Sequence, residues 1–158
     1  MKNKAFFKNE KVEIDDQQER LTLYDIGWFV GIIDGEGCFA LSRKGGDKHQ
    51  YFFPIIQITN MNINVINKCI EILRNAGLSY YFYGCLTKLG KPYYRVEVAG
   101  IKRCKRFFGI FGEYLTCRRT QARLLESFID SRLSKTSHSP ITEEEIGIAK
   151  KLSEINNM

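Results

Sequence analysis

Hydrophobic and polar positions recur with two different periods along this chain, and each change of period marks an element. Thr22 and Asp25 form a capping-box pattern before apolar positions at helical spacing that run to Glu36. Strands are predicted where aromatic and β-branched residues gather or alternate with polar ones, over residues 38–44, 51–59, 80–86 and 93–98. Further helices are predicted over 65–73, briefly around 107–111, over 121–133, and after the capping-box pattern Thr142-Glu-Glu-Glu145.

The predicted order is therefore α-β-β-α-β-β-α with C-terminal helices, an α+β fold. Turn residues at 44–47 and 89–92 separate the strands into two hairpins, each followed by a helix. This weak internal repeat predicts one antiparallel sheet that carries its helices on one face. We expect an N-terminal extension over 1–19, one domain over 20–135, and a C-terminal helix within 136–158 that packs on the domain or extends it.

The first predicted helix breaks ordinary helix rules along one face and at its tip. Gly27, Gly31 and Gly35 are spaced four apart, and each should cost about 1 kcal/mol relative to Ala. Asp34 and Glu36 lie at the C-terminal end, where the helix dipole favours cations. Glycines on one face allow a second helix to approach closely, and the two carboxylates suggest a metal ion at the tip.

The charge distribution favours a polyanionic partner. The net charge is +6, but residues 37–135 hold 17 Lys/Arg and 6 Asp/Glu, a local net charge of +11. A basic middle with many aromatics suits nucleic acid, although a solvated basic surface without a ligand is about equally compatible with charge alone.

Cysteine usage and hydropathy exclude other classes. The five cysteines are scattered without a CxxC pair, and there are only two histidines, so a zinc site is not expected. The cysteines are expected to be reduced thiols. No apolar run approaches the roughly 20 residues that span a bilayer, so no membrane is expected as a partner. His138 is assigned no role.

Residues 29–37, Phe-Val-Gly-Ile-Ile-Asp-Gly-Glu-Gly, resemble the signature motif of the LAGLIDADG homing endonucleases. The resemblance implies the αββαββα domain of that family, with a saddle-shaped sheet, over about residues 20–135. Only one motif is present, so the chain resembles the single-motif members, which act as homodimers with their motif helices paired at the two-fold axis. The residues expected at this contact are Gly27, Gly31, Val30 (bulkier than the family's usual small residue) and Asp34, whose family role is structural.

The same resemblance implies a catalytic site at the helix tip. Glu36 and the Gly35 carbonyl would bind Mg²⁺, the expected divalent cofactor, for phosphodiester hydrolysis. Asn60 matches a polar family position after the second strand. Arg118 matches a basic position before a later helix, with Gln121 downstream. The alternatives are a solvated acid at Glu36 and general phosphate or surface contacts at Arg118 and Arg119.

The sheet face away from the helices is the expected DNA surface. Counting by twos places Phe39, Ile56, Ile58, Val96 and Val98 inward, whereas residues 80–83 cannot be phased. The outward residues, together with Arg119, are expected to bind DNA: Cys38, Ala40, Ser42, Lys44, Tyr51, Phe53, Ile55, Gln57, Thr59, Tyr93, Arg95 and Glu97. An amphipathic sheet with a merely wet face is the alternative. Lys102, Arg103, Lys105 and Arg106 are expected to meet phosphate or solvent.

The sequence thus predicts a homodimeric, Mg²⁺-dependent, site-specific double-strand DNA endonuclease encoded in an intron. Such a protein would reside inside an organelle or in the cytoplasm of a microbe. Two alternatives stay open. One is a non-cleaving intron maturase or nucleic-acid-binding protein of the same fold, with intron RNA as a further partner. The other is a dimeric scaffold with an incidental basic patch.

Overall fold

The computed structural model describes residues 10–12, 21–45 and 51–158. Its elements, in chain order, are β1 (Glu10–Val12), α1 (Leu23–Glu36), β2 (Gly37–Lys44), β3 (Tyr51–Asn60), α2 (Ile63–Asn75), β4 (Tyr80–Leu86), β5 (Pro92–Ala99), α3 (Ile101–Phe111), the 3₁₀ turn η1 (Gly112–Tyr114), α4 (Arg119–Leu133) and α5 (Glu143–Asn156). From α1 to α3 this is the predicted αββαββα order, and α4 and α5 are the predicted C-terminal helices. No helix in the described part of the chain has the length and apolar character needed to cross a membrane.

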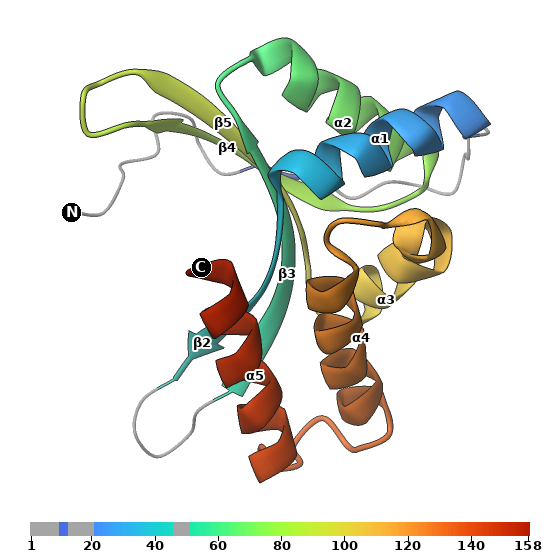
Figure 1. The fold of residues 1–158 in the computed structure, drawn as a ribbon, viewed down its shortest axis with the longest axis vertical. Helices are drawn as coiled ribbons and strands as arrows, with labels where there is room; N and C mark the ends of the chain where they lie inside the picture. The colour runs from blue at the N-terminus through green and yellow to red at the C-terminus, as the bar shows by residue number, and fades with distance from the viewer. Residues whose placement is uncertain (1–9, 13–20, 46–50) are drawn as a thin grey trace.

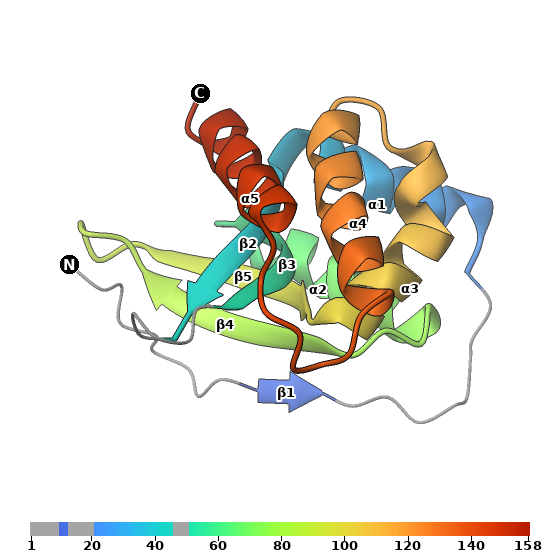
Figure 2. The ribbon, with the colours of Figure 1, turned by 90° about the horizontal axis from the view of Figure 1, so that it is seen from below.

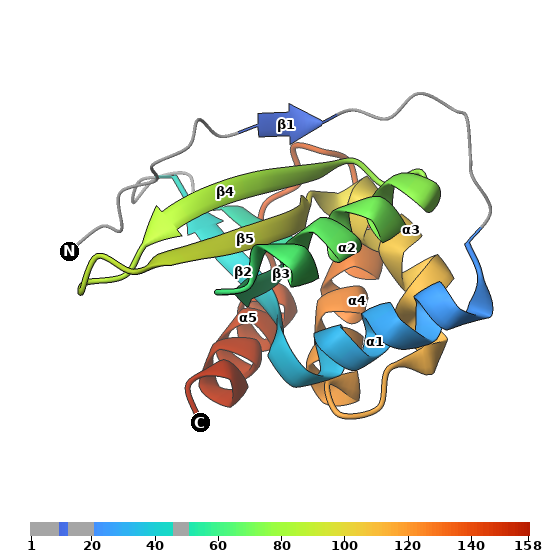
Figure 3. The ribbon, with the colours of Figure 1, turned by 90° about the horizontal axis from the view of Figure 1, so that it is seen from above.

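The strands form one antiparallel sheet in the order β1-β4-β5-β3-β2. The sheet curves, and α1 to α4 lie on one side of it, so that none of these four helices covers the other face (Figure 1). This confirms the predicted fold class. The short strand β1, which pairs with β4 at one edge, was not predicted (Figure 3). The expected N-terminal extension otherwise falls on residues 1–9 and 13–20, outside the described residues.

Side chains from the inner sheet face and the helices form one aromatic-rich core. The ring centroids of Phe29 and Phe111 lie 4.8 Å apart, and those of Phe39 and Phe108 lie 5.9 Å apart. Each fully buried aromatic or aliphatic side chain stabilises the fold by roughly 1.5–3 kcal/mol. Because α1 buries Phe29, Val30 and Ile33 in this core, the axis and tip of α1 are held firmly against the sheet.

Helix α5 covers the other edge of the sheet, beside β2 (Figure 2). The Asn156 Nδ2 donates to the Phe39 carbonyl at 2.8 Å, so α5 satisfies a backbone group of an edge strand. Leu152 is buried in the core. The C-terminal helix therefore packs on the domain.

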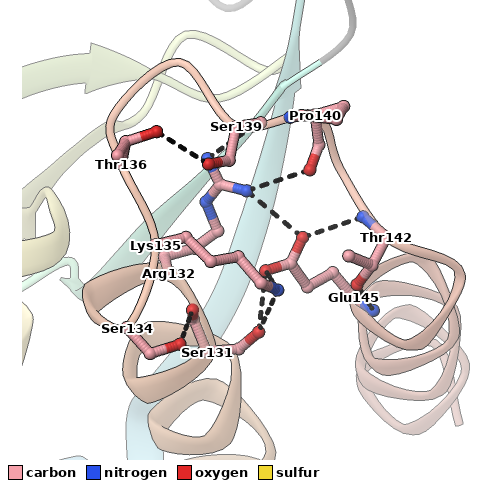
Figure 4. A network of polar contacts seen from close by, with 9 residues as sticks. All are labelled: Ser131, Arg132, Ser134, Lys135, Thr136, Ser139, Pro140, Thr142 and Glu145. Atoms are coloured by element: carbon pink, nitrogen blue, oxygen red, sulfur yellow. Dashed lines mark hydrogen bonds and ion pairs between the residues drawn. The ribbon is translucent and has the colours of Figure 1, made fainter.

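The start of α5 is anchored by the fully buried carboxylate of Glu145 (Figure 4). It accepts hydrogen bonds from Ser131 Oγ at 2.8 Å, Lys135 Nζ at 2.9 Å and Arg132 Nη1 at 3.3 Å. It also accepts the Thr142 backbone N–H at 3.0 Å and so closes the predicted capping box. Although burial opposes ionisation, the Thr142, Lys135 and Ser131 hydrogen bonds lower the pKa of Glu145 to about 2.

Candidate nucleic-acid interface and active site

Helix α1 passes directly into β2, and this junction places Glu36 at the border between the helix layer and the open sheet face. A Cβ atom at Gly37 would lie 2.5 Å from the carbonyl oxygen of Ile33, closer than real Cβ contacts come. Glycine at this position is therefore required by the close approach of the two backbone segments. The last motif glycine makes the abrupt turn possible, and the turn leaves the Glu36 side chain exposed.

Asn60, at the end of β3, meets Glu36 at this junction. Its Nδ2 donates a hydrogen bond to Oε2 of Glu36, while its Oδ1 accepts the backbone N–H of Asn62 at 2.7 Å. The register that pairs Gly37 with Ile58 brings the two residues together from positions 24 apart in the chain. The structure thus joins two of the expected catalytic residues.

Arg118, the residue before α4, reaches the same place from a third element. Its Nη2 donates to the carbonyl of Gly35 and its Nε to the carbonyl of Asp34, both at 3.3 Å. The three expected catalytic residues therefore converge on the last turn of α1. Gln121, in contrast, lies among the buried residues of α4.

Asp34, which was also expected at a dimer contact, holds the loop that carries Arg118. Its carboxylate accepts the Thr116 hydroxyl at 2.6 Å, the Thr116 N–H at 2.9 Å and the Arg118 N–H at 3.0 Å. Burial raises the pKa of Asp34, but these hydrogen bonds outweigh it and hold the pKa below its usual value. The carboxylate is therefore committed to a contact inside its own chain, as the structural role of this motif position implies.

The donor set at the tip of α1 fits a hard divalent cation. Glu36 offers carboxylate oxygens, and the Gly35 carbonyl keeps a second lone pair beside its Arg118 contact. Burial, with the Glu36 charge adding to it, raises the pKa of Cys69 to about 12, so this thiol stays protonated. Within the described residues, no three His, Cys, Asp or Glu side chains gather. A bound Mg²⁺ would hence take its other oxygens from water and phosphate, as this ion commonly does.

The open sheet face carries the predicted side chains. The predicted inward residues of β2, β3 and β5 are buried on the inner face: Phe39, Ile56, Ile58, Val96 and Val98. This confirms which side chains of these strands face the core. The outward residues align across the sheet in rows: Cys38 beside Gln57, Gln57 beside Glu97, and Thr59 beside Arg95. On β4, Tyr80 is buried, so Tyr81 and Tyr83 face outward next to Glu97 and Arg95. Four successive aromatics gave no polar alternation from which to predict this.

Glu97 differs from the expectation that it contacts DNA. Only 7% of the residue is exposed, because it lies on the central strand β5, between Gln57 of β3 and Tyr81 of β4. Burial raises the pKa of Glu97, and Arg95, Tyr83 and Lys44 partly offset the rise. Glu97 is thus an interior group of this face rather than a free surface acid.

The glycine face of α1 is open in the single chain. A Cβ atom added at Gly27, Gly31 or Gly35 would find nothing within 4 Å, and Leu23 is 80% exposed at the start of the same face. Val30 corrects the expected contact set, because only 6% of it is exposed and it packs in the core. Its bulk therefore fills the interior of its own chain.

Several basic side chains have partners inside the chain. Arg119 donates from Nε to the Leu115 carbonyl at 3.0 Å, and Lys105 pairs with Asp130 at 2.8 Å. Lys102 and Arg106 are exposed on α3. The basic character of the chain is thus divided between structural contacts and open surface.

Together, the fold and the site define an α+β domain with an open, curved sheet and an acidic helix tip at its border. This is the fold of the LAGLIDADG homing endonucleases. The archaeal intron-encoded homing endonuclease I-Vdi141I, solved with DNA, aligns with a TM-score of 0.64 and 17% identity over 83% of each chain. The LAGLIDADG homing endonuclease I-LtrWI, bound to target DNA, aligns with a TM-score of 0.63 and 19% identity over 92% of this chain and 47% of its own.

A third solved structure, the homing endonuclease I-CvuI with DNA in the presence of Mg²⁺, aligns with a TM-score of 0.53 and 16% identity over 84% of this chain and 98% of its own. Among curated proteins, an uncharacterised protein of Methanocaldococcus jannaschii is 33% identical over 58 residues. That match spans 37% of this chain and only 20% of the relative. No protein-family model matches the chain.

Proposed function

We propose that this protein is a site-specific double-strand DNA endonuclease that acts as a homodimer and needs a divalent cation, Mg²⁺ by preference. The observation that carries the proposal is the convergence of Glu36, Asn60 and Arg118 on the last turn of α1, beside the open sheet face. The DNA complexes of structural neighbours support the same substrate.

The side chains at the tip have complementary tasks in this proposal. Glu36 and the Gly35 carbonyl would hold the cation, which supplies Lewis-acid activation of water and charge neutralisation at the scissile phosphate. Asn60 fixes the orientation of the Glu36 carboxylate through its hydrogen bond. Arg118 offers a permanently charged guanidinium for the phosphate, a positioning task, because arginine does not readily exchange a proton.

The dimer is proposed from the bare face of α1. Three helix glycines carry a propensity cost that no contact inside the described chain explains. A second copy of the same face would turn that cost into close helix packing and an isologous contact. The chain spans 47% of I-LtrWI, so it supplies about one half of a protein of that size.

The test is cleavage of a library of intron-insertion-like DNA duplexes in Mg²⁺. Wild-type protein should cut both strands of a long, pseudo-palindromic site, and Glu36→Gln should lower the rate by at least about 1,000-fold while DNA binding persists. Glu154→Gln, which changes an exposed acid on α5, should cut like wild type. Tight RNA binding without cleavage by any of the three proteins would instead establish the maturase alternative.

A further inference from the structure

Arg95 occupies the middle of the open sheet face. It lies on β5, the central strand of the five, and its cross-strand neighbours are Tyr83 on β4 and Thr59 on β3. Its side chain is 32% exposed. Lys44, the other cation among the outward residues expected on these strands, lies at the end of the edge strand β2. Arg95 is therefore the charged donor that faces the centre of any ligand on this surface.

Glu97 forms an ion pair with Arg95 on the side of the guanidinium that faces the protein. The Nε atom of Arg95 lies 3.0 Å from Oε2 of Glu97, an ion pair whose N–H is not aligned for a hydrogen bond. The Glu97 side chain is only 8% exposed, so the pair is shielded on its protein side. A shielded ion pair is screened by water and salt less than an exposed one. Glu97 thus restrains the inner edge of the guanidinium.

Tyr83 restrains the plane of the same group. The Cζ of Arg95 lies 4.5 Å from the centroid of the Tyr83 ring, a cation–π contact. With one edge beside Glu97 and one face against Tyr83, the guanidinium retains few orientations. Within the described part of the chain, neither terminal nitrogen of Arg95 has an acceptor. These two donors are hence held in place but unused.

We propose that Arg95 reads a guanine in the major groove, with Glu97 and Tyr83 as positioning residues that hold its guanidinium for this contact. The inference rests on the proposed DNA-binding function and adds the base that this position selects. Two parallel N–H donors match the O6 and N7 acceptors of guanine, and a restrained guanidinium makes this pair at a lower entropic cost.

The surroundings favour a base edge over a phosphate. A phosphate contact needs little more than an exposed charge, and Lys44 offers one at the end of the edge strand β2. A buried acid near a phosphate would oppose binding, whereas beneath a base-reading arginine it fixes geometry. Since Thr59 precedes Asn60, the guanine should lie toward the cleavage end of each half-site.

The test selects duplexes with a randomised segment by binding, in Ca²⁺ in place of Mg²⁺. Wild-type protein should enrich a site with one strongly preferred guanine in each half. Arg95→Gln should lose that preference by about 10- to 100-fold and keep the preferences at other positions. Glu97→Gln should weaken the same guanine preference while raising affinity for random DNA, because it removes a buried acid from beneath the DNA-binding face.

Lys44→Gln is the matched control, because it removes an exposed cation of the same sheet face and should weaken binding alike for all sequences. The inference is overturned if Arg95→Gln keeps every base preference, or if Glu97→Gln changes all positions equally. If wild-type protein enriches no sequence, the proposed function fails as well. The two failures are therefore distinguishable.

Discussion

The hydroxyl of Thr116 donates a hydrogen bond to Oδ2 of Asp34 across 2.6 Å, joining segments 82 residues apart. Thr116 belongs to the loop that leads to Arg118, and Asp34 belongs to the last turn of α1. The contact fixes the loop against the helix tip. The first acid of the motif therefore assembles the site in which the second acid, Glu36, is proposed to act.

Replacing Asp34 by Asn should loosen this loop. The amide keeps one acceptor oxygen and brings an N–H₂ group toward donors, so the free energy of unfolding should fall by about 1–3 kcal/mol in urea titrations. Cleavage should fall further, on the order of 100-fold, because Arg118 loses its placement. Thr116→Ser, which retains the hydroxyl, should behave like wild type. Unchanged stability in Asp34→Asn would show that the hydrogen bonds of Asp34 do not hold the loop.

The stabilisation that Asp34 gives through its hydrogen bonds to Thr116 and Arg118 should also depend on pH. Its folded pKa is lowered, so its stabilising contribution is present above the unfolded value of 3.8 and is lost as the pH falls through the folded value. The difference in unfolding free energy between wild type and Asp34→Asn should accordingly be constant near pH 7 and shrink in acid. Urea titrations at several pH values measure it.

Gly37→Ala should destabilise the chain strongly. The new Cβ would collide with the Ile33 backbone carbonyl at 2.5 Å, and the helix–strand junction can relieve this only by moving. We expect a loss of roughly 2–4 kcal/mol in thermal or urea unfolding. Gly35→Ala is the matched control, since open space surrounds that position. Equal effects of the two substitutions would rule out the steric account.

Gly31→Arg should abolish the dimer and leave the fold of each chain intact. The position is exposed and has open space around it, so the side chain fits the monomer but blocks a second helix. Gly109→Arg, on α3, has the same open surroundings and should not affect association. Analytical ultracentrifugation at micromolar concentration measures the result. A monomeric wild type would contradict the shared-site proposal.

Glu145→Gln should release the start of α5. The lowering of the Glu145 pKa from 4.5 to about 2 corresponds to on the order of 3 kcal/mol in favour of the folded, ionised form. That contribution is present above pH 4.5 and is lost as the pH falls toward 2. The variant should therefore be less stable at pH 7 and show a flatter acid unfolding curve. Glu144→Gln, an exposed neighbour, should match wild type.

Most of the fold followed from local patterns. The capping boxes at Thr22 and Thr142 and the period-two strands gave elements whose ends differ from the structure by two residues or fewer in most cases. Strand β1 escaped prediction because three residues carry no period, and their pairing with β4 depends on the finished sheet edge. Which residues of β4 face the core could not be predicted, because its run of aromatics suits either face of the sheet.

The candidate site was predictable only in part. Glu36, Asn60 and Arg118 could be named from the motif and its spacing, and the structure brings them together. Val30 was expected at a dimer contact, but the direction of its side chain around the helix places it in the core. Glu97 was expected at the surface, because alternation gives the face of a residue and not how far its neighbours cover it.

The sequence by itself determined the elements, their order, the single motif and the sheet face that carries polar side chains, since these depend on neighbours within a few positions along the chain. The tertiary structure decided which of three carboxylates is exposed to a ligand. Asp34 is occupied by a loop 82 residues away, Glu97 is covered by a central strand's neighbours, and Glu36 alone of the three is exposed at the junction. Burial and partner choice arise from long-range packing, which no local spacing encodes.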